Sequence, residues 1–134
     1  MNYWLMKSEP GTYSWDDLVK DKQTFWDGVR NYQARNNMKE MKVGDLILFY
    51  HSVNEKSVLG IAKVVKESYQ DPTTDDDRWV VVDIAPEQAL KRPVKLDEIK
   101  NEARLNQMVL VRNSRLSVQP VKKEEFDIII GMSE

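Results

Sequence analysis

An unbroken apolar run from Leu46 to Tyr50, bounded by Asp45 and His51, is the strongest structural signal in this chain. A strand exposed on one face would alternate polar and apolar residues, so a continuous run of this length predicts a strand buried on both faces. Such a strand needs covering layers on either side. We therefore expect a domain in which a sheet and helices share one interior.

Several further short strands are predicted on either side of this run. Apolar and β-branched residues indicate strands at Tyr3–Lys7, Val58–Val65, Trp79–Ile84, Val109–Arg112 and Arg115–Val118. Gly60, inside one of them, predicts a bulge or a bend of the kind found in small barrels. Phe25–Gly28 is expected to be an aromatic loop, and Gln70–Asp77 a polar one.

Helices are predicted between these strands. A capping box from Ser14 to Asp17 opens a short helix at about Trp15–Lys20. A longer helix is expected at Arg30–Met41, where Ala34, Met38 and Met41 recur on one face. One or two turns at Asp97–Glu102 and a final helix at Lys122–Ile130 complete the set. The predicted fold class is therefore α+β, a small mixed barrel of five or six strands, closed or half-closed, with short flanking helices.

Length and composition restrict the function classes. The 134 residues fit one domain, and 41% hydrophobic content supports a packed core. With no cysteine and one histidine, the chain cannot form disulfides, zinc fingers, iron–sulfur clusters or a multi-histidine metal site, and no cofactor is expected. No apolar run approaches the length of a membrane span, and the first residues do not resemble a signal peptide. We expect a cytoplasmic protein.

The charge balance bears on the kind of partner. Twenty basic residues face 22 acidic ones, giving a formal net charge of −2. This balance argues against a strongly cationic nucleic-acid arm but allows a local basic patch. Most affinity for nucleic acid comes from neutralising phosphates, so such a ligand would bind weakly unless the charges are segregated.

Polar side chains gather on one face of the longer helix. At 100° per residue, Asn31, Tyr32, Arg35 and Asn36 fall within an arc of about 140°. Two amides, a phenol and a guanidinium could hydrogen-bond a planar heterocycle or grip a phosphate. A solvated helix face is the alternative, and Lys39 in the same arc favours it.

Trp26 and His51 are the other candidates for chemistry. Trp26 lies in a loop beside Gly28, ahead of the polar helix face, where it could stack on a base; tryptophans elsewhere are expected in the core. His51 lies in Tyr50–Ser52 at a strand end, where it could donate a hydrogen bond, act as a general base, or serve only structure. Arg112 and Arg115 could meet phosphates.

Five segments in fixed order carry a family resemblance. They are Tyr3–Pro10, Gly28–Asn36, Phe49–Ser52, Gly60–Ala62 and Arg115–Val121. Through them the chain resembles the EVE domain family from about residue 2 to 132. The resemblance implies a PUA-like fold related to YTH domains, which read methylated adenine in RNA. It also implies binding of modified bases, with modified cytosine in DNA the leading proposal, and no established catalytic activity.

The resemblance also implies where a ligand would bind. The predicted ligand-binding residues are Lys7, Ser8, Trp26, Asn31, Tyr32, Arg35, Asn36, Tyr50, His51 and Ser52. Predicted phosphate or rim contacts are Arg30, Trp79, Arg112 and Arg115, of which Trp79 and Arg112 could instead belong to the core. No catalytic residue and no metal ligand is predicted.

Three functions remain open at this point. The first is a non-catalytic reader of a modified base in DNA or RNA, acting on a single strand or a flipped base. The second is a binder of a small ligand or a protein partner without nucleic acid, which the near-neutral charge favours. The third is a nucleotide-modifying enzyme that uses His51 as an acid or base.

Overall fold

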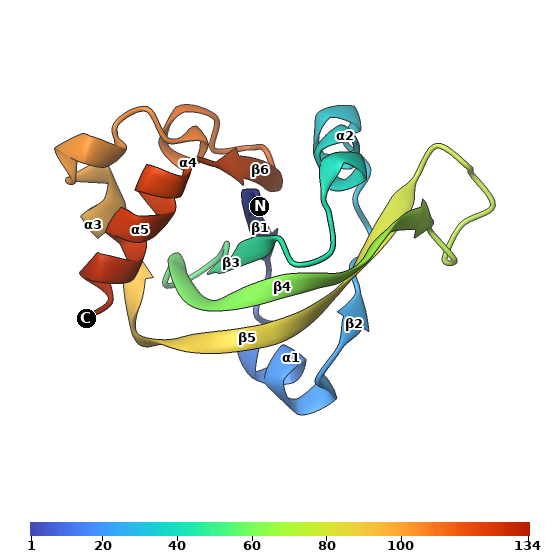
Figure 1. The fold of residues 1–134 in the computed structure, drawn as a ribbon, viewed down its shortest axis with the longest axis horizontal. Coiled ribbons are helices and arrows are strands. Elements are labelled where there is room, and N and C mark those ends of the chain that lie inside the picture. Colours follow the sequence, from blue (N-terminus) through green and yellow to red (C-terminus); the bar gives the residue numbers. More distant parts are fainter.

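One mixed sheet of six strands, in the order β2-β5-β4-β3-β1-β6, forms the centre of the computed structural model, which describes all residues from 1 to 134 (Figure 1). Its strands are β1 (Tyr3–Ser8), β2 (Thr24–Phe25), β3 (Leu46–His51), β4 (Ser57–Gln70), β5 (Val80–Lys95) and β6 (Val118–Val121). β1 and β3 are parallel, and every other neighbouring pair is antiparallel. β2 and β6 lie apart at the two edges, so the sheet does not close (Figure 1). The predicted α+β fold is confirmed in its half-closed form.

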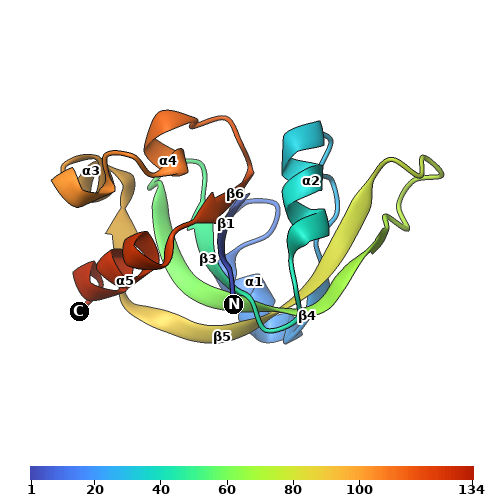
Figure 2. The same ribbon diagram turned by 45° about the horizontal axis from the view of Figure 1, so that its top comes forward.

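Five short helices and one 3-10 turn flank the sheet. They are α1 (Trp15–Asp21), α2 (Tyr32–Glu40), α3 (Leu96–Lys100), the turn η1 (Ala103–Leu105), α4 (Val109–Arg112) and α5 (Lys123–Met132). The C-terminal helices gather at the far end of β5, whereas α2 stands on the other side of β1 and β6 (Figure 2). No helix has the length and hydrophobicity needed to cross a bilayer.

Both faces of the central strands are buried, as the apolar run Leu46–Tyr50 predicts. Because side chains alternate along a strand, β1 and β3 contribute to two separate hydrophobic clusters. The first cluster, on the α2 side, includes Trp4, Met6, Ile47, Phe49, Ala34 and Met38. The second, on the side of the C-terminal helices, includes Leu5, Leu48, Tyr50, Leu105, Phe126 and Ile129. These two cores fix the strand ends around which the candidate site is built.

Gly60 allows a close approach between β4 and α1. The register of β3 and β4 shifts at this point, so the predicted bulge is confirmed. A Cβ at position 60 would lie 2.4 Å from the Trp15 indole, closer than any real contact. Glycine therefore lets Trp15 reach across the strand to pack edge-on against Phe49, with ring centroids 5.5 Å apart.

Two predicted strands were wrong. Val109–Arg112 forms the helix α4, and the strand expected at Arg115–Val118 instead runs from Val118 to Val121. A four-residue run with two valines and a leucine is ambiguous between helix and strand, and here tertiary packing decides, since Leu110 is buried in the second cluster.

Element boundaries also differ from the prediction. β4 and β5 are much longer than expected, and the polar loop begins after Gln70. The longer helix begins at Tyr32 because the side chain of Asn31 accepts a hydrogen bond from the Ala34 backbone N–H at 2.9 Å, which makes Asn31 its N-cap. Phe25 belongs to β2, so the aromatic loop is shortened to Trp26–Gly28.

Candidate functional site

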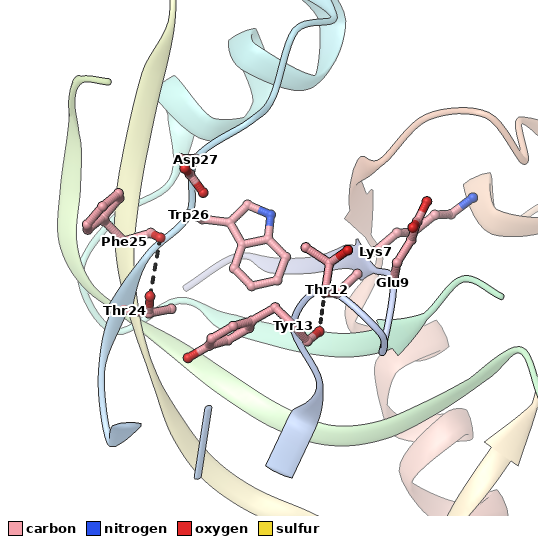
Figure 3. Close-up of a pocket in the computed structure, with 9 residues that line it drawn as sticks. Lys7, Glu9, Thr12, Tyr13, Thr24, Phe25, Trp26 and Asp27 are labelled. Atoms are coloured by element: carbon pink, nitrogen blue, oxygen red, sulfur yellow. Dashed lines mark hydrogen bonds between the residues drawn. The ribbon is translucent and has the colours of Figure 1, made fainter. Parts of the chain in front are cut away.

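A cavity of about 520 Å³ lies between the β1–α1 connection and the segment around β2 (Figure 3). Its volume falls within the usual range for small-ligand sites. We call it the Trp26 cavity. It is lined by Lys7, Ser8, Glu9, Thr12, Tyr13, Thr24, Phe25, Trp26 and Asp27.

Trp26 forms the aromatic wall of this cavity. Its backbone N–H donates to the Val82 carbonyl at 2.8 Å, which prolongs the β2–β5 pairing by one residue. Gly28 then turns the chain with a φ of +79°, a conformation that favours glycine. The half-buried indole packs edge-on against Phe49 and Tyr13, with centroid distances of 5.6 and 6.1 Å. It is thus held on two sides, and its ring nitrogen is turned towards the side of the cavity where Thr12 lies (Figure 3).

Several polar groups of the cavity are already engaged by the protein. The Ser8 hydroxyl donates to the Tyr13 carbonyl, and the Lys7 ammonium donates to the Ser114 carbonyl. Burial, together with Lys56, lowers the pKa of Lys7. Burial and a hydrogen bond to Asp21 raise the pKa of Tyr13 to about 12, so its hydroxyl stays protonated.

Glu9 and Asp27 are the acidic residues of the cavity, and both carboxylates are free. Neither has a cation within ion-pair distance, and neither accepts a side-chain hydrogen bond within the chain. Ionised carboxylates only accept hydrogen bonds. Beside the Trp26 indole, they suit a planar ring that carries N–H donors, and they disfavour a phosphate in the cavity itself.

A second group of aromatic and basic side chains lies on α2 and the adjoining loop. Tyr32, which is 52% exposed, stacks on Trp79 with centroids 5.3 Å apart. The Arg35 guanidinium lies 5.0 Å from the Tyr32 ring, and Arg78 donates to the Tyr32 hydroxyl at 3.1 Å. Arg30 lies over Trp79 at 5.6 Å. We call these five residues the Tyr32 cluster.

The Tyr32 cluster is anchored by Asp71. This fully buried carboxylate accepts from Arg30 at 3.0 Å and from both the backbone and the hydroxyl of Thr73. Burial alone would raise its pKa, but these hydrogen bonds outweigh burial and hold the pKa below its usual value. Asn36 serves the same cluster by accepting two hydrogen bonds from Arg35.

The strand end Tyr50–Ser52 supports the cavity from behind and lines none of it. His51 Nε2 accepts a hydrogen bond from the Trp15 backbone N–H at 3.1 Å, at the start of α1. Burial lowers the pKa of His51 and favours this neutral acceptor form. Tyr50 points into the second core, where burial raises its pKa to about 12. The Ser52 backbone N–H donates to the Ser8 carbonyl at 2.9 Å.

The structure thus distributes the predicted site residues over separate places. Lys7, Ser8 and Trp26 line the cavity, whereas Tyr32, Arg35, Arg30 and Trp79 form most of the Tyr32 cluster and Asn31 and Asn36 support it. Arg112 and Arg115 are exposed on α4 and the loop after it.

Sequence reasoning missed six residues of the cavity and one of the cluster. They are Glu9, Thr12, Tyr13, Thr24, Phe25 and Asp27 in the cavity, and Arg78 in the cluster. For the cavity residues, closeness in sequence to Pro10-Gly11 or to Trp26 was the available signal. A turn that follows a strand end and faces an aromatic loop is a common place for ligand groups.

The fold defines the class of this domain. Searches of solved structures match the YTH domain of Zygosaccharomyces rouxii MRB1, crystallised with N6-methyladenosine RNA, with a TM-score of 0.60 over 98% of this chain and 86% of that one. At 17% identity this likeness concerns the fold alone. The six-stranded sheet with its flanking helices is that of a PUA-like domain.

Residues 2–132 match the sequence model of the EVE domain, and the chain belongs to this family. Thymocyte nuclear protein 1 of Mus musculus is 40% identical over 99% of this chain and 74% of its own length. The human THYN1 protein, whose structure is known in complex with 5-methylcytosine-containing DNA, is 37% identical in sequence. Its structure matches with a TM-score of 0.91 over 100% of this chain and 98% of that one. The resemblance seen in the sequence is confirmed.

Proposed function

We propose that this protein is a non-catalytic nucleic-acid-binding module that reads a modified base in the Trp26 cavity. The observation that carries the proposal is the Trp26 indole, held edge-on by Phe49 and Tyr13 as the wall of a cavity of about 520 Å³. An aromatic wall of this kind stacks on an extruded or single-stranded base. The human relative crystallised with 5-methylcytosine-containing DNA supports the same ligand class.

The free carboxylates favour a base that carries an exocyclic amino group, which cytosine, adenine and guanine have and thymine lacks. Glu9 and Asp27 line the cavity without cationic partners, and carboxylates accept hydrogen bonds from the exocyclic amino group of cytosine. Thymine presents a carbonyl oxygen at the corresponding position, which a carboxylate repels. Among the bases with an amino group, the ligand of the human relative, 5-methylcytosine-containing DNA, favours a modified cytosine.

Absence of catalysis is part of the proposal. His51 Nε2 accepts a hydrogen bond from the Trp15 backbone N–H, and His51 lines no part of the cavity. The Ser8 hydroxyl is engaged with the Tyr13 carbonyl, so it is not poised as a nucleophile. For the compartment we retain the cytoplasm, in association with nucleic acid.

Binding of short oligonucleotides to the whole chain tests the proposal. Dye-labelled single strands of DNA and RNA, about 8 nucleotides long, would carry one central cytosine, 5-methylcytosine or 5-hydroxymethylcytosine. We expect one modified base to bind more tightly than cytosine in fluorescence anisotropy. Trp26→Ala should weaken that binding about 10- to 100-fold, because a stacked base is worth about 1–3 kcal/mol.

Tyr32→Ala is the matched control, since it removes an aromatic ring outside the cavity. It should leave the preference for the modified base unchanged. Equal affinity of Trp26→Ala and the wild type for every oligonucleotide would refute the proposal. Tight binding of a small metabolite with no binding of oligonucleotides would favour the ligand-binding alternative instead.

A further inference from the structure

The basic residues of this chain are unevenly distributed. The stretches 28–39 and 103–123 hold eight of the 20 basic residues and none of the 22 acidic ones. A net charge of −2 therefore conceals two acid-free segments. Whether they make one surface depends on where the fold places them.

The fold brings these two stretches together. The Asn37 side chain donates to the Val118 carbonyl at 2.7 Å, joining α2 to β6. Leu116 and Val118 share the first hydrophobic cluster with Ala34 and Met38. α2 and the segment leading into β6 consequently stand next to each other in both views of the ribbon (Figures 1 and 2).

Three arginines of this region have no carboxylate partner. Of the seven arginines in the chain, Arg30, Arg78, Arg92 and Arg104 form ion pairs with acidic residues. The other three are Arg35, Arg112 and Arg115, and all of them lie in the acid-free stretches. Arg35 donates only to neutral acceptors, the side-chain oxygen of Asn36 and the backbone carbonyl of Arg78. None of the three guanidiniums is therefore neutralised by a carboxylate of the chain, so the positive charge of each can attract an external anion.

Two of the segments that carry the unpaired arginines adjoin the Trp26 cavity. Lys7, which lines the cavity, donates through its backbone N–H to Ser117 at 2.9 Å and through its ammonium to Ser114, within the segment that carries Arg115. On the other side, only Asp27 to Val29 separate Trp26 from Arg30 and the helix that carries Arg35. A strand whose base entered the cavity would meet basic side chains in both directions.

We propose that α2 and the 112–118 segment form one phosphate-binding face, on which Arg35, Arg112 and Arg115 contact the nucleic-acid backbone on either side of the base held in the Trp26 cavity. This inference rests on the proposed function and adds the path of the strand. It separates two tasks: the cavity, with its carboxylates, selects the base, and the face neutralises phosphates. It also explains how a chain of net charge −2 can bind a polyanion.

The salt dependence of binding tests this face. The triple variant Arg35→Gln/Arg112→Gln/Arg115→Gln would be compared with a control of equal charge change on other surfaces, Lys20→Gln/Arg92→Gln/Lys100→Gln. Affinity for a single strand of DNA or RNA bearing 5-methylcytosine would be measured from about 50 to 200 mM salt. We expect the slope of log K against log salt to fall by about 2 in the first variant only, since each phosphate contact contributes about 0.7.

The outcomes separate this proposal from the previous one. An equal change of slope in both triple variants would overturn the face, even if the preference for the modified base persisted. A change confined to the first variant, with no preference for the modified base in the wild type, would retain the face and overturn the base reader. No binding of either strand at the lowest salt would overturn both. Unfolding midpoints in urea would verify that both variants are folded.

Discussion

The Trp26 cavity and the Tyr32 cluster contain similar aromatic rings, yet their free polar groups differ in charge. Trp26 is held by edge-on contacts and faces an open cavity with two unpaired carboxylates. Tyr32 and Trp79 stack on each other, so their rings are already partly covered, and arginines surround them. The neighbours of an aromatic ring, more than the ring itself, decide whether it suits a base or a phosphate-bearing strand.

The largest effect on stability is expected at Gly60, in the packing behind Trp26. Gly60→Ala would place a Cβ 2.4 Å from Trp15, whose indole packs on Phe49 behind Trp26. Such overpacking should lower the free energy of unfolding by about 1–3 kcal/mol, measured by urea denaturation. Gly11→Ala, with no atom within 4 Å of the added methyl, is the control and should change little. Equal urea midpoints for the two variants would show that Trp15 can move away from position 60 at little cost.

The next largest effect on stability is expected at Asp71, which anchors the Tyr32 cluster. Asp71→Asn removes the buried charge that holds Arg30 and Thr73 and should cost about 1–2 kcal/mol of unfolding free energy. Asp76→Asn, in the same loop, removes an exposed ion pair with Arg78 and should have little effect. If both substitutions behaved alike, the Tyr32 cluster would not depend on its buried anchor.

Asn31 distinguishes helix capping from base reading. Asn31→Ala should destabilise the protein by about 1 kcal/mol because it removes the N-cap of α2, whereas Asn31→Asp should preserve stability. Both variants should keep the preference for a modified base in the anisotropy assay. Loss of that preference in Asn31→Asp would show that Asn31 contacts the base. The Trp26 cavity and the Tyr32 cluster would then belong to one binding site.

The smallest effect concerns pH. The pKa of His51 lies below 6.5 in the folded state, so between the two pKa values the unfolded chain binds more protons. Stability should therefore fall as the pH drops from about 7 through the folded pKa, where protonation also breaks the bond to Trp15. His51→Gln should reduce this loss in urea unfolding between about pH 7.5 and 5. An unchanged pH dependence would mean that His51 does not support the cavity through α1.

Strong local patterns allowed much of the fold to be predicted. The run Leu46–Tyr50, the capping box at Ser14 and the bulge at Gly60 each follow from local chemistry, and the structure confirms them. The strand predicted at Val109–Arg112 was wrong because a short apolar run does not distinguish helix from strand.

The cavity was harder to predict because distant pairing creates it. Trp26 could be proposed from its loop position, but Thr12 and Tyr13 join it only when β2 pairs with β5 some 60 residues later in the chain. The division of the predicted site into two regions depends in the same way on Trp79, which covers Tyr32 from a remote loop. No local pattern in the sequence encodes either contact.

The open sheet has a consequence for association between chains. Unpaired strand edges are templates for aggregation, and a sheet that does not close keeps two of them. Here the edge formed by β6 has four residues, whereas on the other edge β2 pairs with only Asp83 and Ile84 of the 16-residue strand β5. Pro120 removes one N–H from the β6 edge. The β6 edge thus offers another chain little backbone, whereas the part of β5 that β2 does not cover is the place where a second chain could extend the sheet.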